Sequence, residues 1–243
     1  MAKARTIISV CVAALVAVYL VAVVIVSSTY PIDTVCHHLR ITIRDWDERQ
    51  YVTPEELQEQ LRRQGLFPIG QSVTDISTQR IEWSVRKNDM VRNAECYLLP
   101  QGDVCIELTQ RVPLLRVVTA AEAYLIDTDR LRMPIRPNMD LDILTANGNV
   151  GQRMAENELA ELATWLQQED YWRPRIARIY VRAPHDVALV LKEDGALILL
   201  GEVAGYKQKM HKLRTLEKNL RELNEPPHYR EYDLRFEGQV VTR

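Results

Sequence analysis

The longest uninterrupted apolar stretch of the sequence lies near its N-terminus. The twenty residues Ile7–Val26 carry no charge and only one strongly polar side chain, Ser9. As a helix they would be about 30 Å long, which is the thickness of the hydrocarbon core of a bilayer. Lys3 and Arg5 precede the stretch and no further Lys or Arg occurs before Arg40, so the positive-inside bias places the N-terminus in the cytoplasm. The pattern predicts a single transmembrane helix that anchors the rest of the chain on the far side.

A cleaved signal peptide is the competing interpretation of this stretch. Its apolar region is usually about 7 to 15 residues long and ends in a small-x-small cleavage signal. Here the apolar run is longer, and Val24-Ile25-Val26 leads into Ser27-Ser28 without an Ala-x-Ala pattern. The sequence therefore favours an uncleaved helix over residues 7–26, with a cytoplasmic tail of residues 1–6 and a linker of residues 27–34.

Beyond the linker, strand and helix patterns follow one another in the order β-α-α-β-β. Alternating apolar positions predict a strand at Val35–Ile43. A helix is predicted to begin after Thr53, because Thr53 can cap it, Pro54 suits its first position and Glu56 can complete a capping box. A second helix is predicted from about residue 75 or 77 to residue 88. These elements, together with the hairpin that follows, predict one small α+β domain over residues 35–112.

The hairpin of this domain joins the predicted strands Val91–Leu99 and Asp103–Val112 through a three-residue loop that contains Gly102. In that register Cys96 and Cys105 point to opposite faces of the sheet, so they cannot form a disulfide. The chain has four cysteines, one of them inside the apolar stretch, which is too few for a disulfide-built scaffold. The other three are interpreted as small hydrophobes, and a bond from Cys36 to Cys96 or Cys105 is the alternative left open.

The second half of the chain predicts a C-terminal antiparallel β domain with helices over residues 113–243. A strand is predicted at residues 176–181, and an apolar hairpin at residues 187–191 and 196–200. A helix with Leu159, Leu162, Ala163 and Leu166 on one stripe precedes them. A long helix follows at residues 206–224 and is expected to direct a set of apolar side chains inward: Met210, Leu213, Leu216, Leu220 and Leu223. The overall fold class is α+β.

Candidate chemistry is sparse. His37 and His38 are neighbours on a predicted strand and point to opposite faces, so they do not easily share a metal. Asp127 and Asp129 could be paired carboxylates for acid–base catalysis, but they fall where a turn is expected and are interpreted as turn residues. The net charge of −2 gives no argument for nucleic-acid binding. We predict no catalytic, metal-binding or cofactor-binding residues, and no enzyme.

One basic surface remains to be interpreted. The predicted long helix displays six cations around its apolar stripe, partly balanced by Glu217 and Glu222: Lys207, Lys209, Lys212, Arg214, Lys218 and Arg221. A solvated helix face is one interpretation, and contact with an acidic partner or with lipid head groups is the other.

Several short motifs resemble known families. The β-α-α-β-β order and the segment Arg80–Tyr97 resemble a POTRA domain, the polypeptide-transport-associated module. Gln110-Arg111-Val112-Pro113 resembles the stretch that leaves this domain in the cell-division family FtsQ/DivIB, and Tyr124–Asp127 followed by Met133-Pro134 resembles its pair of short strands. The terminal Asp233-Leu234-Arg235-Phe236 resembles its last strands. The likeness covers nearly the whole chain and is greatest to the version found in Bacteroidetes bacteria, although the cytoplasmic tail is much shorter than in many members.

The resemblance implies a function. It implies a non-catalytic, single-pass inner-membrane scaffold of the divisome, with its N-terminus in the cytoplasm and its C-terminal domains in the periplasm. The implied partners are FtsB- and FtsL-like division proteins and, through them, an FtsW/FtsI-like septal peptidoglycan synthase. The alternative is a bitopic subunit of an envelope transport or secretion complex, because POTRA-like modules serve there too.

The last strand of the chain is the predicted partner site. Exposed edge strands are usually blunted by charge, proline or a covering segment, and Gln239–Thr242 carries no charge or proline. Such an edge suits β-augmentation by a partner segment, and the resemblance implies that an FtsB-like strand adds here. Arg235 would then pair with an acidic group and Phe236 would be a buried anchor; the alternative is that Leu234 and Phe236 pack in the core. The predicted partner-binding residues are Tyr232, Leu234, Arg235, Phe236, Gln239, Val240, Val241 and Thr242.

Overall fold

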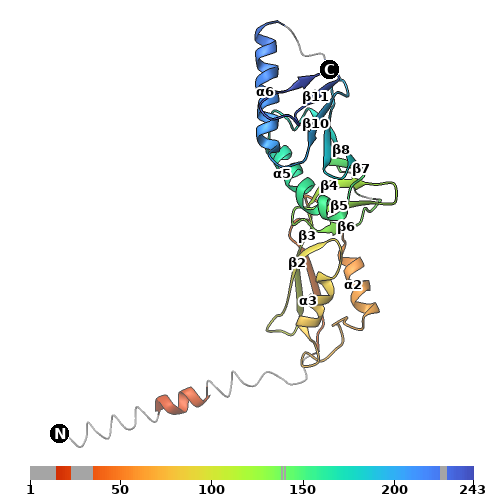
Figure 1. The fold of residues 1–243 in the computed structure, drawn as a ribbon. Helices are drawn as coiled ribbons and strands as arrows, with labels where there is room; N and C mark the ends of the chain where they lie inside the picture. Colours follow the sequence, from red (N-terminus) through yellow and green to blue (C-terminus); the bar gives the residue numbers. More distant parts are fainter. Residues whose placement is uncertain (1–14, 23–34, 138, 140, 225–228) are drawn as a thin grey trace, which may run out of the picture. The chain divides into compact units, whose positions relative to one another are not determined.

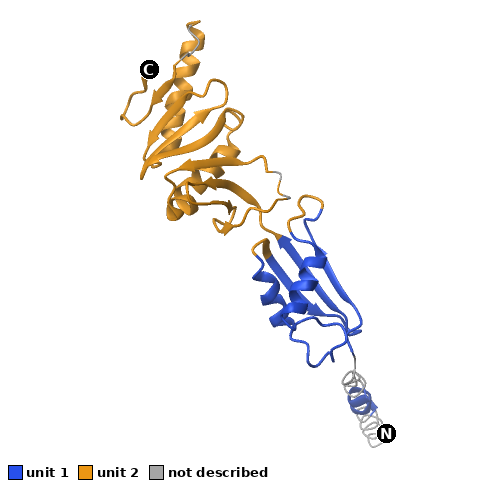
Figure 2. Cartoon of the chain, turned by 90° about the vertical axis from the view of Figure 1, so that its right-hand side faces the viewer, with its two compact units in different colours: residues 1–46, 52–88, 93–109 blue, residues 47–51, 89–92, 110–243 orange. Residues whose placement is uncertain are grey.

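The computed structural model describes residues 15–22, 35–137, 139, 141–224 and 229–243. Within the predicted anchor Ile7–Val26, residues 15–22 are helical, and the rest of that segment lies outside the described residues, as do the predicted tail and linker. Among the helices that are described, none has both the length and the apolar character needed to span a bilayer. The chain divides into two compact units, the first made of residues 1–46, 52–88 and 93–109 and the second of residues 47–51, 89–92 and 110–243 (Figure 2).

The first unit contains a three-stranded sheet and two helices (Figure 1). Its elements are β1 Leu39–Ile43, α2 Pro54–Arg63, α3 Thr78–Arg86, β2 Val91–Leu98 and β3 Val104–Gln110. The sheet order is β1-β3-β2, and β1 runs parallel to β3. The predicted capping box is present, because the Thr53 hydroxyl accepts the Glu56 N–H and the Glu56 carboxylate accepts the Thr53 N–H. The predicted order of elements is therefore confirmed, although β1 begins at Leu39 and Val35 forms only an isolated bridge with Ser72.

The core of the first unit lies between the helices and one face of the sheet. The fully buried side chains on these elements are Leu57, Leu61, Ile81, Val85, Ala94, Val104, Ile106 and Leu108. The cysteines Cys36, Cys96 and Cys105 are all free, so the alternative disulfide from Cys36 is not formed. Cys36 and Cys105 are buried and Cys96 is partly buried, which agrees with their interpretation as small hydrophobes.

The second unit is built on one nine-stranded sheet with the order β12-β11-β10-β9-β8-β7-β4-β5-β6. Its strands are β4 Pro113–Val118, β5 Ala123–Asp127, β6 Arg132–Met133, β7 Leu144–Gly148, β8 Ile176–Ala183, β9 Asp186–Leu191, β10 Leu197–Gly201, β11 Glu231–Asp233 and β12 Val241–Thr242. The expected purely antiparallel sheet is wrong, since β4–β7, β7–β8 and β10–β11 are parallel pairs. The reason is that parallel neighbours need long crossover connections, and the helices after β7 and β10 provide two of them.

The helices of the second unit lie on the same side of this sheet (Figure 1). They are a continuous segment of α4 Gln152–Met154, a π-helical turn Ala155–Leu159 and α5 Ala160–Gln168, followed later by α6 Tyr206–Glu222. Together with the covered face of the sheet they bury one large apolar cluster.

The inward face of α6 differs from the prediction at two positions. Met210 and Leu213 are buried as predicted, but Leu223 is 70% exposed because the helix ends at Glu222. Glu217, which was expected to balance charge on the solvated face, is instead completely buried. Its burial is possible because the side chains of Arg175 and Tyr171 satisfy its carboxylate.

Candidate functional site

The predicted partner site lies at one end of the nine-stranded sheet. In the described part of the chain, β12 is the last strand of the sheet and pairs only with β11. The pairing is antiparallel, with Thr242 opposite Tyr232 and Val241 opposite Asp233. The outer side of β12 is therefore a free edge within the described residues.

The hydrogen bonds around β12 show which backbone groups face this free edge. The Glu231 N–H donates to the Arg243 carbonyl (3.1 Å) and the Arg243 N–H donates to the Glu231 carbonyl (3.0 Å). In an antiparallel pair, such hydrogen-bonded residue pairs alternate with pairs whose backbone groups point outward. The N–H and C=O of Thr242 therefore point away from β11, whereas those of Val241 point towards it. An added strand would pair with Thr242.

The predicted site residues divide between the core and the surface. Tyr232 and Leu234 are each 2% exposed and belong to the apolar cluster. Val240 is half-buried and packs against the same cluster. Phe236, in contrast, is 46% exposed, so the aromatic side chain is available at the surface next to the edge. The alternative in which Leu234 and Phe236 both pack in the core thus holds for Leu234 but not for Phe236.

Arg235 has a carboxylate partner within its own chain. Its guanidinium donates to both carboxylate oxygens of Asp233 (2.8 and 2.6 Å), and its backbone N–H donates to one of them (3.1 Å). These hydrogen bonds lower the pKa of Asp233, which is only 1% exposed. The Arg235 side chain is still 39% exposed. It lies over Gly201, where an added β-carbon would come within 2.9 Å of the Arg235 side chain.

Asp233 is a site residue that the sequence interpretation missed. β11 ends at Asp233, and Asp side chains commonly accept the backbone N–H two residues further on, so the Asp-x-Arg spacing in the sequence is itself a signal for this pair. The structure thus gives Arg235 two roles at the edge: it neutralises a buried carboxylate, and it presents the remainder of its guanidinium to solvent.

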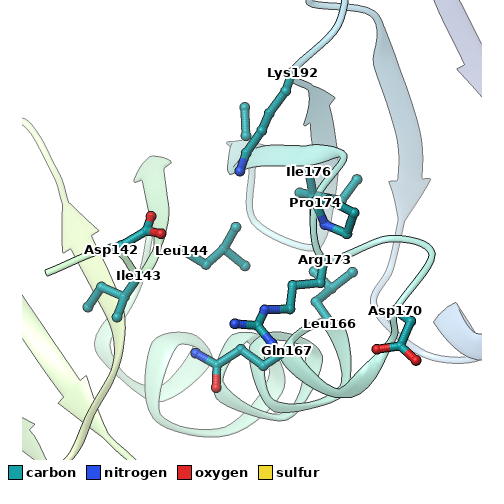
Figure 3. A pocket seen from close by; sticks show the side chains of 11 residues that line it. Asp142, Ile143, Leu144, Leu166, Gln167, Asp170, Arg173, Pro174, Ile176 and Lys192 are labelled. Carbon is teal, nitrogen blue, oxygen red and sulfur yellow. The ribbon is translucent and has the colours of Figure 1, made fainter.

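A cavity in the second unit lies elsewhere, beside the end of α5 and the starts of β7 and β8. Its volume is about 570 Å³, and its walls include Leu144 and Leu166. Arg173 and Lys192 extend towards it from different sides (Figure 3). The described lining contains no Ser, Thr, Cys or His side chain, and its charged side chains are Asp142, Asp170, Arg173 and Lys192.

The two carboxylates considered for acid–base catalysis hold a turn. Asp127 accepts the backbone N–H groups of Asp129 (2.9 Å) and Leu131 (2.7 Å) and lies 3.5 Å from the Arg111 guanidinium. Asp129 makes two hydrogen bonds of 2.6 Å with Arg92. The Asp127 carboxylate thus holds the turn through backbone N–H groups, whereas the Asp129 carboxylate pairs with Arg92, 37 positions earlier in the sequence. Among the described residues, no group of three or more His, Cys, Asp or Glu side chains is placed to hold a metal ion.

Comparison with known proteins identifies both halves of the chain. Residues 112–243, more than half of the chain, match the family model described as FtsQ/DivIB, C-terminal related. Residues 34–109 match the model described as a POTRA-like domain. A search among curated proteins finds no matching relative.

Proposed function

The chain belongs to the FtsQ/DivIB family and carries a POTRA-like domain, and we propose on this basis that it is a non-catalytic scaffold of the cell-division machinery. Members of this family are cell-division proteins. The POTRA-like region precedes the FtsQ/DivIB-related region, as the sequence motifs indicate. The proposed scaffold is anchored in the inner membrane by residues 7–26. Its tail of residues 1–6 lies in the cytoplasm and its globular regions, residues 35–112 and 113–243, lie in the periplasm.

The scaffold would work by binding other division proteins at the edge of its large sheet. The observation that carries this proposal is the free edge of β12, where the N–H and C=O of Thr242 point away from the sheet. A segment of an FtsB-like partner would add there as a further strand through main-chain hydrogen bonds. The exposed ring of Phe236 would be covered by the partner and act as an aromatic anchor. FtsL-like and, indirectly, FtsW/FtsI-like proteins would be recruited through this contact.

Proline substitutions test the edge directly. Thr242→Pro removes an N–H that faces the free side, and proline is tolerated at such edge positions, so the domain should still fold. We expect the affinity for the periplasmic segment of the FtsB-like partner to fall about tenfold or more, because main-chain pairing is lost and proline obstructs the edge. Thr242→Ala keeps the N–H and is the matched control, with an expected change below about threefold.

The register also shows which variants are unsuitable for this test. Val241→Pro would remove a donor from the pairing of β12 with β11, so loss of binding would only report a damaged domain. Arg235→Glu would place a second carboxylate beside Asp233. Phe236→Ala is cleaner, because that residue is 46% exposed and lies outside the buried cluster. If Thr242→Pro and Phe236→Ala both retain full affinity, the partner binds elsewhere.

A depletion experiment separates the division role from the alternative role in transport or secretion. Depletion of a division scaffold should give filamentous cells, because septum formation fails while growth continues. Depletion of a secretion subunit should instead leave cell length normal and reduce export of envelope proteins. A secretion defect without filaments would contradict the proposed function.

A further inference from the structure

The surface of α6 carries several cations, and only part of them form hydrogen bonds that support the fold. The Lys209 ammonium donates to the carbonyls of Leu200 (2.8 Å) and Glu202 (2.7 Å), so that side chain is part of the structure. The cations at the C-terminal half of the helix, Arg214, Lys218 and Arg221, are exposed instead. The helix lies over the covered face of the sheet (Figure 1).

These three cations surround a hollow beside an aromatic ring. The hollow has a volume of about 400 Å³ and is lined by Tyr171, Arg214, Lys218, Arg221 and Glu222. The Arg214 guanidinium lies 4.7 Å from the centre of the Tyr171 ring. Arg221 is close enough to Tyr171 to act on the pKa of its hydroxyl in the lowering direction, although burial and Glu217 raise that pKa overall.

The buried carboxylate of α6, Glu217, does not neutralise these cations. Glu217 accepts two hydrogen bonds from the Arg175 guanidinium (2.7 and 3.0 Å) and one from the Tyr171 hydroxyl. Its charge is therefore balanced by Arg175. The only carboxylate that lines the hollow is Glu222, which lies 3.8 Å from Lys218 with both side chains at least 65% exposed. Exposed pairs of this kind are weak, so the hollow keeps a net positive charge.

We propose that this hollow, formed by Tyr171 and the C-terminal half of α6, binds an acidic peptide segment of a partner protein. Carboxylates of the segment pair with Arg214, Lys218 and Arg221, and an apolar side chain enters the hollow against the Tyr171 ring. Charge complementarity selects an anionic segment. An arginine stacked on a ring is already ordered and presents a planar fork that suits a carboxylate. A concave site with an aromatic wall fits one side chain of a peptide better than a flat membrane surface.

A labelled acidic peptide tests this site. The full chain, reconstituted in nanodiscs of uncharged phosphatidylcholine, is titrated against fluorescent Glu-Leu-Glu-Glu-Leu-Glu, and anisotropy reports binding. Replacing each glutamate of the peptide by glutamine should weaken binding about tenfold or more, since the ion pairs are lost. Raising the salt concentration should weaken it as well, because exposed charges are screened.

Charge-reversal variants locate the bound peptide. Arg214→Glu combined with Arg221→Glu should weaken binding about tenfold or more, because attraction becomes repulsion. Both side chains are exposed, so the variant should unfold at the temperature of the original chain. Lys192→Glu combined with Lys207→Glu makes the same change in net charge outside the hollow, and it should alter binding by no more than about twofold.

Three results would overturn the proposal. The first is equal binding by the Arg214/Arg221 variant and its control, which would show non-specific attraction. The second is equal binding of the glutamate and glutamine peptides, or no saturable binding of the glutamate peptide. The third is displacement of the bound peptide by short-chain phosphatidylglycerol at concentrations below the dissociation constant of the peptide, which would assign the hollow to lipid head groups. None of these measurements involves the β12 edge, so a result that overturns the peptide site would leave the proposed division role unaffected.

Discussion

Removing Arg175 should destabilise the second unit more than removing any exposed arginine. Glu217 is completely buried, and the Arg175 side chain, itself 12% exposed, supplies two of the hydrogen bonds to its carboxylate. In Arg175→Ala that carboxylate remains buried with only the Tyr171 hydroxyl as a side-chain donor. Breaking a buried pair in this way costs about 3–5 kcal/mol. Replacing both partners, as Arg175→Met with Glu217→Leu, leaves no buried charge and should bring the unfolding free energy back to within about 2 kcal/mol of the original chain.

Urea unfolding followed by tryptophan fluorescence measures these differences. Trp172 is 2% exposed and packs edge-on against Tyr171 at 4.8 Å, so it reports on this network. Trp46 and Trp83 are replaced by phenylalanine in every variant to silence the first unit. Arg178→Ala, which truncates an exposed arginine of β8, is the control and should change the unfolding free energy by less than about 0.5 kcal/mol. The reasoning is refuted if Arg175→Ala costs less than about 1 kcal/mol, or if the double variant is as unstable as the single one.

Three further predictions concern other parts of the molecule. Burial raises the pKa of the partly buried Cys96 thiol to about 12, so mass spectrometry should show slow alkylation of Cys96 at pH 8; rapid alkylation would contradict the raised pKa. Cys96→Ala should cost about 1 kcal/mol in thermal unfolding. A β-carbon at Gly148 (φ 99°) would lie 2.2 Å from a backbone carbonyl oxygen, whereas one at Gly65 (φ 67°) would have no atom within 4 Å. Gly148→Ala should therefore lower the melting temperature clearly more than Gly65→Ala, which bears only backbone strain of about 1–2 kcal/mol. Arg235 lowers the pKa of Asp233, so this pair should stabilise the fold above about pH 4, near the usual pKa of an unfolded Asp, and lose that contribution as the pH falls through the lowered pKa. In Arg235→Gln, carboxyl NMR titration should show a higher pKa for Asp233, and an unchanged pKa would refute the pairing.

Local structure could be predicted wherever the signals lie close together in the sequence. The capping box of Thr53 and Glu56 forms because both groups belong to one helical turn. The hairpins form around Gly102 and Gly195, whose φ values of 90° and 75° are ones that glycine adopts without strain. The apolar periodicity of α6 correctly placed Met210 inside. The position of the free edge in the last strand of the chain was also anticipated from the sequence, although whether a partner binds there stays a prediction.

Tertiary structure decided the features that depend on residues far apart in the chain. The parallel pairing of β10 with β11 arises because α6 carries the chain back across the sheet, and strand periodicity contains no information about which strands become neighbours. Glu217 looked like a surface residue, since its charge and helical spacing match the basic residues around it. It is buried because Arg175, 42 positions earlier, reaches its carboxylate. The sequence by itself thus determined the local elements and their faces, because these follow from near-neighbour sterics and hydrogen bonds. Strand order, sheet direction and the balance of buried charge were decided only by the folded chain, because they depend on which distant groups come into contact.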